Sequence, residues 1–117
     1  MNTELLSGYW QIEKVQQGGE TFYPALGNTQ YDYYQLTDER IGFRKKISPG
    51  IGERLNTSLD QTDFRIENRS GFWQLQFQTP WDYWQETIVK IDSQTLVLEH
   101  NSKRYFYQRK RITNEQP

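Results

Sequence analysis

The sequence predicts an all-β fold, a single antiparallel up-and-down β-barrel of about eight strands. Apolar and polar residues alternate along most of the chain, with no sustained helical periodicity. The alternating runs are short and are joined mostly by short turns, which favours an antiparallel meander. Gly8-Tyr9-Trp10 stands near one end of the chain and Arg109 near the other. We expect the first and last strands to pair antiparallel, with the Arg109 guanidinium over the Trp10 indole, so that the sheet closes.

Size and composition fit one small barrel. The chain has 117 residues, enough for one domain, with the barrel over about 6–110 and a polar tail over 111–117. Aromatic residues make up 15% of the chain against 34% for all hydrophobic residues, so rings must form much of the core. Mean hydropathy is low, at −0.97. The glutamines that alternate with apolar residues in Phe72–Thr79 indicate a sheet with a wet outer face rather than disorder.

Charge and cysteine content exclude several classes of function. Lys and Arg number 14 and Asp and Glu 15, so the formal charge of −1 gives no electrostatic case for nucleic acid or an anionic membrane. The absence of cysteine excludes disulfides, thiol catalysis and thiolate metal sites. No stretch approaches the ~20 apolar residues of a membrane span, and the N-terminus has no signal-peptide pattern. Taken as written, the chain predicts a cytoplasmic monomer or weak homodimer; a removed signal peptide is the alternative.

The first half of the chain contains three clear strands and two turns. Strands are expected at Tyr9–Gln16, Tyr31–Leu36 and Ile41–Ile47. A long glycine-containing connection, Gln17–Gln30, separates the first two strands and carries Phe22 and Tyr23. Turn-forming residues occupy 37–40 and 48–52.

The run Glu53–Asn68 is ambiguous. It alternates in two parts, and Asp60-Gln61-Thr62-Asp63 interrupts them, so it is either one long bulged strand or two short ones. An even number of strands in an up-and-down barrel closes its ends antiparallel, and an odd number closes them parallel. Since only the even count brings Arg109 beside Trp10, we count this run as one interrupted strand.

Four further strands complete the barrel. They are expected at Phe72–Thr79, Tyr83–Ile91, Thr95–Glu99 and Arg104–Lys110. Turn residues lie between them at 80–82, 92–94 and 101–103.

Four segments carry a resemblance to a known family. They are Gly8-Tyr9-Trp10, Leu36–Ile41, Asp92–Leu98 and Tyr105–Arg109. On these segments the chain, over Leu6–Lys110, resembles the lipocalin superfamily, most closely the short lipocalin-like domains of Bacteroidetes, which implies a calycin-type barrel. The chain is shorter than secreted transport lipocalins and lacks their cysteines and C-terminal helix. These departures bear on ligand transport more than on the barrel.

Strand parity predicts where a ligand would bind. The connections after odd-numbered strands share one end, the mouth, whereas Gly8, Trp10 and Arg109 mark the opposite, closed end. Phe22 and Tyr23 in the long connection would then form a lid over the mouth. Ile51 and Trp81 would lie on its rim. The alternative is that the lid segment fills the barrel.

The apolar alternation also predicts the inward-facing side chains. They are Trp10, Ile12, Tyr34, Leu36, Ile41, Phe43, Trp73, Leu75, Phe77, Val89, Ile91, Leu96, Leu98, Tyr105 and Tyr107. Each face, continued toward the mouth, adds polar groups. The candidate ligand-binding residues are therefore Tyr34, Phe43, Lys45, Trp73, Phe77, Gln85, Thr87, His100 and Tyr105. Lys45 would be a cation for a ligand carboxylate, unless it snorkels to the rim or a bulge turns it outward.

No catalytic or metal-binding pattern appears in the sequence. His100 is the only histidine and cannot build a metal site alone. It could act as a general base or haem ligand, but a hydrogen-bonded histidine at a strand end is the stronger interpretation. Nucleophile-elbow, zinc-protease, phosphate-loop and dinucleotide motifs are absent. We expect no enzyme activity, cofactor or metal.

The predicted function is non-enzymatic binding of a small apolar or amphipathic molecule in the barrel mouth. The alternative is a protein-interaction module that uses exposed aromatics such as Trp81 and Trp84. A more distant alternative is single-stranded nucleic-acid binding by the basic run Gly42–Lys46 beside Tyr31, Tyr33 and Tyr34. The balanced net charge instead favours a solvated strand whose Arg44 and Lys46 face outward.

Overall fold

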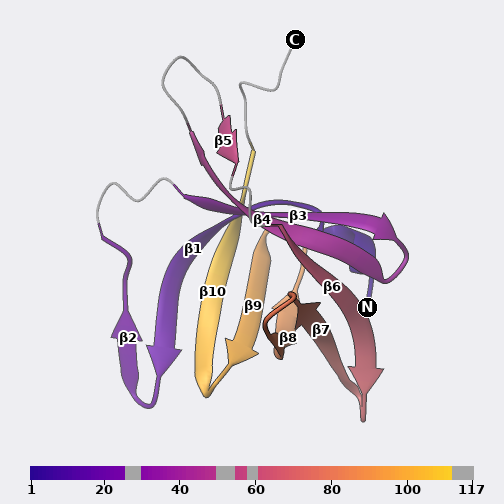
Figure 1. The fold of residues 1–117 in the computed structure, drawn as a ribbon. Helices are drawn as coiled ribbons and strands as arrows, with labels where there is room; N and C mark the ends of the chain where they lie inside the picture. The colour runs from indigo at the N-terminus through magenta and orange to yellow at the C-terminus, as the bar shows by residue number, and fades with distance from the viewer. Residues whose placement is uncertain (26–29, 50–54, 58–60, 112–117) are drawn as a thin grey trace.

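The computed structural model describes residues 1–25, 30–49, 55–57 and 61–111, and they form a closed antiparallel up-and-down barrel (Figure 1). Its eight strands are β1 (Gly8–Gln17), β3 (Tyr31–Asp38), β4 (Ile41–Pro49), β6 (Thr62–Arg69), β7 (Phe72–Gln78), β8 (Tyr83–Ile91), β9 (Thr95–His100) and β10 (Lys103–Lys110). Two short strands, β2 (Glu20–Phe22) and β5 (Leu55–Thr57), and a 3₁₀ turn, η1 (Thr3–Leu6), are added to it. The predicted fold class is confirmed.

The barrel closes where the sequence predicts. Each barrel strand pairs antiparallel with the next, and β10 pairs with β1, opposing Trp10 and Arg109. The guanidinium carbon of Arg109 lies 4.2 Å from the centroid of the Trp10 ring. The cation–π contact that motivated the even strand count is therefore present.

The ambiguous run Glu53–Asn68 contains two strands that occupy one place in the barrel. β5 pairs with the end of β4, with Thr57 opposite Ile47. β6 pairs with the beginning of β4, with Thr62 opposite Arg44. The two segments therefore follow each other along one edge of β4. The even strand count is preserved although the run is divided.

The predicted lid is instead an extra strand at the edge of β1. Glu20–Phe22 forms β2 and pairs with β1, placing Phe22 opposite Val15. Figure 1 shows this hairpin extending beside β1, away from β3. Phe22 is 50% exposed and Tyr23 72%, so these side chains neither cover nor fill the barrel. The missed signal is Gly18-Gly19, a two-residue hairpin turn in which Gly18 takes a φ of +59°.

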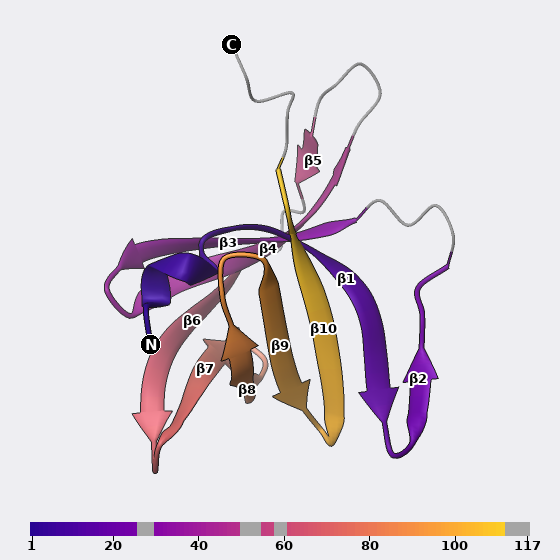
Figure 2. The same cartoon turned by 180° about the vertical axis from the view of Figure 1, so that it is seen from behind.

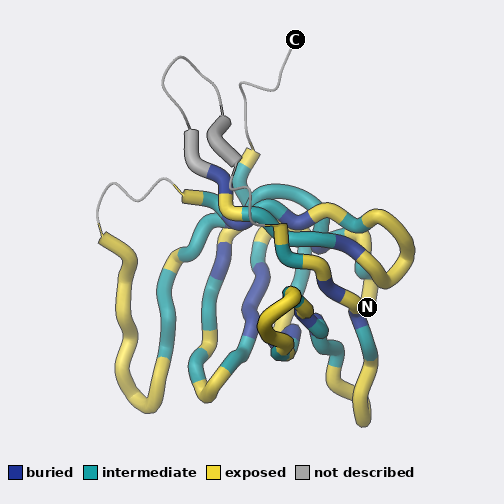
Figure 3. Tube along the Cα trace, in the orientation of Figure 1, coloured by how far each residue is buried: buried dark blue, intermediate teal, exposed yellow. Residues whose placement is uncertain are grey.

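The core lies inside the barrel and extends to its closed end. Figure 3 shows buried positions concentrated in the barrel strands, with β2 and the turn tips exposed. At the closed end, Leu6 of η1 is buried, and its carbonyl accepts a 2.9 Å hydrogen bond from the Trp10 indole. Figure 2 shows η1 near the turn between β8 and β9. Within the described residues, no helix has the length and apolar character needed to cross a membrane.

Candidate functional site at the barrel mouth

Arg109 fastens the closed end of the barrel. Its Nη1 donates to the Ser7 carbonyl at 2.8 Å, its Nε to the Ser93 carbonyl at 2.7 Å, and its Nη2 to the Leu5 carbonyl. Gly8 adopts a φ of +128°, and a Cβ there would lie 2.5 Å from Nη1 of Arg109. The glycine thus leaves room for the guanidinium. This end is architectural, as the sequence predicts.

A charged pair crosses the barrel interior. Arg44 of β4 meets Glu86 of β8 in a bidentate pair, with Nη1–Oε1 at 3.1 Å and Nη2–Oε2 at 3.2 Å. The two side chains are only 16% and 11% exposed. Arg44 also donates to the Tyr34 hydroxyl at 3.0 Å, and the Trp84 indole donates to Glu86 at 2.9 Å. This network fills the interior with satisfied polar groups.

Burial and neighbouring charges together determine the ionisation of the interior groups. It raises the pKa of Tyr34 well above its usual value, so the hydroxyl stays neutral and can accept from Arg44. Burial opposes the charge of Arg44, but the electrostatic effects of Tyr34 and Glu86 outweigh it and raise the Arg44 pKa. The pKa of Tyr107 is also raised, again mainly by burial. The interior therefore contains fixed charges and neutral hydroxyls at physiological pH.

A cavity of about 210 Å³ lies at the mouth, between β1, β3, β4 and β10. Its lining residues are Ile12, Val15, Gln30, Asp32, Lys46, Tyr105 and Tyr107. Here β1 has left β3 and pairs with β2 instead. Asp32 and Lys46 form an ion pair of 2.5 Å, in which the Asp32 side chain is 5% exposed and that of Lys46 58%. The cavity combines apolar walls with one partly buried ion pair.

Solved structures with the same fold come from Bacteroides. A lipocalin-like protein from Bacteroides uniformis superposes with a TM-score of 0.56 at 12% identity, covering 91% of this chain and 99% of that one. The chain has a lipocalin-like fold. An uncharacterized protein from Bacteroides eggerthii matches with a TM-score of 0.55 at 6% identity, covering 90% and 99%. At these identities the likeness shows the fold alone. No protein-family model and no curated protein matches the sequence.

Four predicted ligand-binding residues do lie inside the lipocalin-like barrel or at its mouth cavity. Tyr105 lines the cavity. Tyr34 and Phe77 are fully buried beside Arg44, whose guanidinium carbon is 4.1 Å from the Phe77 ring centroid. Trp73 packs against the core under Arg40, 5.1 Å from its guanidinium carbon. Only Tyr105 of these four is placed to touch a ligand in that cavity.

Phe43 and Lys45 lie on the outer wall, so their predicted inward orientation is wrong. The ring centroids of Phe43 and Tyr33 are 6.3 Å apart, and the Lys45 ammonium lies 5.5 Å from the Phe43 centroid.

The opposite, inner face of β4 carries Arg44 and Lys46, which the sequence led us to expect outside. Ile41 was likewise predicted to face inward, but its side chain is exposed. Gly42 explains the reversal: a Cβ there would lie 3.0 Å from the Phe64 ring, so the inner face begins with a residue lacking a side chain.

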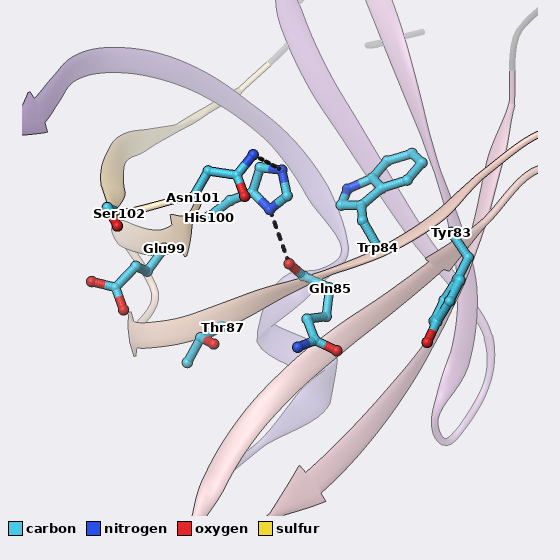
Figure 4. Close-up of a pocket in the computed structure, with 8 residues that line it drawn as sticks. All are labelled: Tyr83, Trp84, Gln85, Thr87, Glu99, His100, Asn101 and Ser102. Carbon is cyan, nitrogen blue, oxygen red and sulfur yellow. Dashed lines mark hydrogen bonds between the residues drawn. The ribbon is translucent and has the colours of Figure 1, made fainter.

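Gln85 and Thr87 are also outside the barrel, and Val89 is exposed. A bulge between Ile88 and Lys90 shifts the alternation, so that Trp84, Glu86 and Ile88 face the core instead. Figure 4 shows the side chains of Gln85 and Thr87 projecting from one side of β8 and Trp84 from the other. Trp84, Gln85 and Thr87 all contribute to the lining of an open depression of about 460 Å³. Its other lining residues are Tyr83, Glu99, His100, Asn101 and Ser102.

His100 links two strands at the rim. Its Nδ1 lies 3.1 Å from the Gln85 carbonyl and its Nε2 lies 3.1 Å from the Asn101 amide (Figure 4). Both ring nitrogens therefore have partners, as the hydrogen-bonded interpretation of this histidine predicts. Among the described residues, no group of three or more His, Cys, Asp or Glu side chains is placed to hold a metal ion.

The remaining rim predictions have different outcomes. Trp81 lies on the turn between β7 and β8 and is 92% exposed. Ile51 lies outside the described residues.

The sequence interpretation missed Asp32, Lys46, Arg44 and Glu86. Arg44 and Lys46 were expected on the outer face, and Asp32 and Glu86 were given no role, whereas all four point inward. One signal was available: Asp32 lies two residues before Tyr34, whose inward orientation was predicted, and period-two alternation places both on the same face.

Proposed function

We propose that this protein is a non-enzymatic binder of a small apolar or amphipathic molecule held in the mouth cavity. The observation that carries the proposal is the composition of that cavity. Ile12 and Val15 give it an aliphatic wall, Tyr105 and Tyr107 an aromatic wall, and the Asp32–Lys46 pair a polar wall. Concave apolar surfaces with a few convergent polar groups are typical of small-molecule sites.

The size of the cavity limits the ligand. Pockets for drug-sized molecules have volumes of roughly 300–1,000 Å³. The mouth cavity, at about 210 Å³, is smaller. Beneath it the interior is occupied by Tyr34, Phe77 and the Arg44–Glu86 pair. The ligand is therefore a small molecule, or a longer one that leaves part of its length outside the mouth.

Native mass spectrometry of the protein purified from its own host tests this proposal. We expect a co-purified small molecule in the wild-type protein. Val15→Phe adds bulk to the cavity wall and should abolish that adduct. Val89→Phe makes the same change on the exposed wall and should retain it. No adduct in the wild type, together with no binding of an added apolar fluorescent probe, would refute the proposal.

A protein-interaction role is the second candidate, because Trp81 is 92% exposed beside the exposed Tyr83. The other tryptophan predicted for this role is not available. Trp84 stacks on Phe77 with ring centroids 5.2 Å apart and donates to Glu86. The Trp81 turn is held by Thr79, whose hydroxyl accepts from the Trp81 and Asp82 amides, so Trp81→Ala should keep the turn. Loss of a host-protein partner without loss of the small-molecule adduct would favour this role.

A further inference from the structure

We propose that the mouth cavity selects a small molecule that carries an ammonium group on an apolar body. The inference rests on the proposed binding function and adds the chemical class of the ligand. It follows from the unequal burial of Asp32 and Lys46, whose ion pair forms the polar wall of the cavity.

The carboxylate of Asp32 is fixed inside the barrel. It lies on the inner face of β3, and its side chain is 5% exposed. A buried carboxylate is costly unless a positive charge or hydrogen-bond donors compensate it. Its short side chain also gives it no route to bulk water. The Asp32 carboxylate therefore favours a cation beside it at the cavity wall.

Lys46 supplies that cation, but its side chain can move away from Asp32. Its side chain is 58% exposed, and a lysine has a long flexible stem that lets the ammonium return to water. An incoming ammonium can take the place of the lysine beside Asp32 without leaving the carboxylate unpaired. Arg44, the other inward cation of β4, is already held by the bidentate pair with Glu86.

The other cavity walls suit the same ligand. The rings of Tyr105 and Tyr107 can attract a cation as well as an apolar body, and Ile12 and Val15 offer aliphatic contact. A ligand carboxylate could reach Lys46, but it would bring a second negative charge next to Asp32. Like charges brought together in a partly buried site disfavour binding, so the cavity discriminates against anions.

Isothermal titration calorimetry with three probes of similar shape tests the inference: 2-phenylethylamine, 2-phenylethanol and phenylacetate. We expect the affinity for the amine to be about tenfold or more higher than that for the alcohol, because a hydrogen bond between charged partners increases affinity by about this factor. Phenylacetate should bind most weakly. Asp32→Asn should reduce amine affinity about tenfold, to the level of the alcohol. Asp63→Asn should not change it, because Asp63 is on the outer wall and bonds Gln61.

A second variant keeps the test valid if Asp32→Asn fails to fold. Lys46→Gln removes the competing ammonium, so amine affinity should rise and added amine should raise the melting temperature more than in the wild type. The alcohol should give no such rescue. The matched control is Lys45→Gln, one residue away on the outer wall, which should behave as the wild type.

The outcomes separate the two proposals. If the alcohol or phenylacetate binds as tightly as the amine, and Val15→Phe abolishes that binding, the inference is wrong and the binding function stands. If none of the three probes perturbs the NMR signals of Tyr105 and Tyr107, and no adduct co-purifies, both proposals are wrong.

Discussion

At the scale of single residues, Arg109 links the segments that meet at the closed end of the barrel. One guanidinium donates to three backbone carbonyls, from η1, from the residue that follows it and from the β8–β9 turn, and it also covers Trp10. These segments are far apart in sequence, so their contacts join the two ends of the chain.

We predict that Arg109→Ala lowers the free energy of unfolding by about 1–3 kcal/mol, because it removes a cation–π contact and three hydrogen bonds to backbone carbonyls, two of them part-buried. Urea denaturation measures this change. Arg104→Ala is the control, since Arg104 makes a half-exposed ion pair with Glu99 and should cost no more than about 0.5 kcal/mol. Equal unfolding midpoints for the two variants would show that Arg109 does not fasten the closed end.

At the scale of elements, sequence patterns predicted the strands better than their faces. Barrel closure followed from residues near the ends of the chain, and seven of the strand runs were evident from alternation and turn residues. In β4 the face assignment was reversed because the inner positions hold Gly42 and Arg44, and in β8 because a bulge shifts the alternation and an inner position holds Glu86. A charged residue is normally evidence for an outer face. It can face the interior only when an oppositely charged partner lies near it, here on the opposite wall of the barrel.

The other differences between sequence and structure also depend on partners distant in sequence. The bulge in β8 becomes visible only when its register with β9 is known. β2 has only three residues, all of them exposed, so no apolar pattern marks it, although the double glycine that precedes it does. A site at the mouth was predicted, but its charged lining was missed because Lys46 was expected outside and Asp32 was given no role.

The Arg44–Glu86 pair ties together β4 and β8, which are not neighbours in the sheet. We predict that Arg44→Met lowers the free energy of unfolding by about 3–5 kcal/mol, because it leaves the Glu86 carboxylate buried without a cation. Chemical denaturation of this variant, and of the double variant that also replaces Glu86, tests whether the uncompensated carboxylate causes the loss.

Arg44→Met with Glu86→Met should be more stable than Arg44→Met alone, since no uncompensated charge remains. Arg69→Met is the matched control, because Arg69 pairs with Glu67 on the exposed surface and should change stability little. Additive losses in the double variant would contradict the pairing.

At the scale of the whole molecule, the two ends of the barrel differ in kind. The closed end is filled by Leu6, Trp10 and Arg109, whereas the mouth has a cavity and an ion pair that is half open to water. Two tyrosines are also buried, Tyr34 in the interior between the two ends and Tyr107 at the wall of the cavity. Ionisation of these hydroxyls would place negative charge at buried positions, so we expect the stability of the barrel to depend on their protonation.

We predict that the barrel loses stability as the pH rises above about 10. Burial raises the pKa of both Tyr34 and Tyr107 in the folded state, while in the unfolded chain each titrates near its usual value of about 10. Above that pH the unfolded chain releases protons that the folded barrel retains, so unfolding becomes more favourable. The slope is at most about 1.4 kcal/mol per pH unit for each tyrosine.

Urea midpoints measured from about pH 8 to about pH 11 give this slope. Tyr34→Phe removes one of the two groups and should reduce the slope, even though it also removes the hydroxyl that accepts from Arg44 and lowers stability at neutral pH. The slope rather than the absolute stability is therefore the diagnostic quantity. A slope that is the same in Tyr34→Phe as in the wild type would mean that the Tyr34 hydroxyl reaches water in the folded barrel.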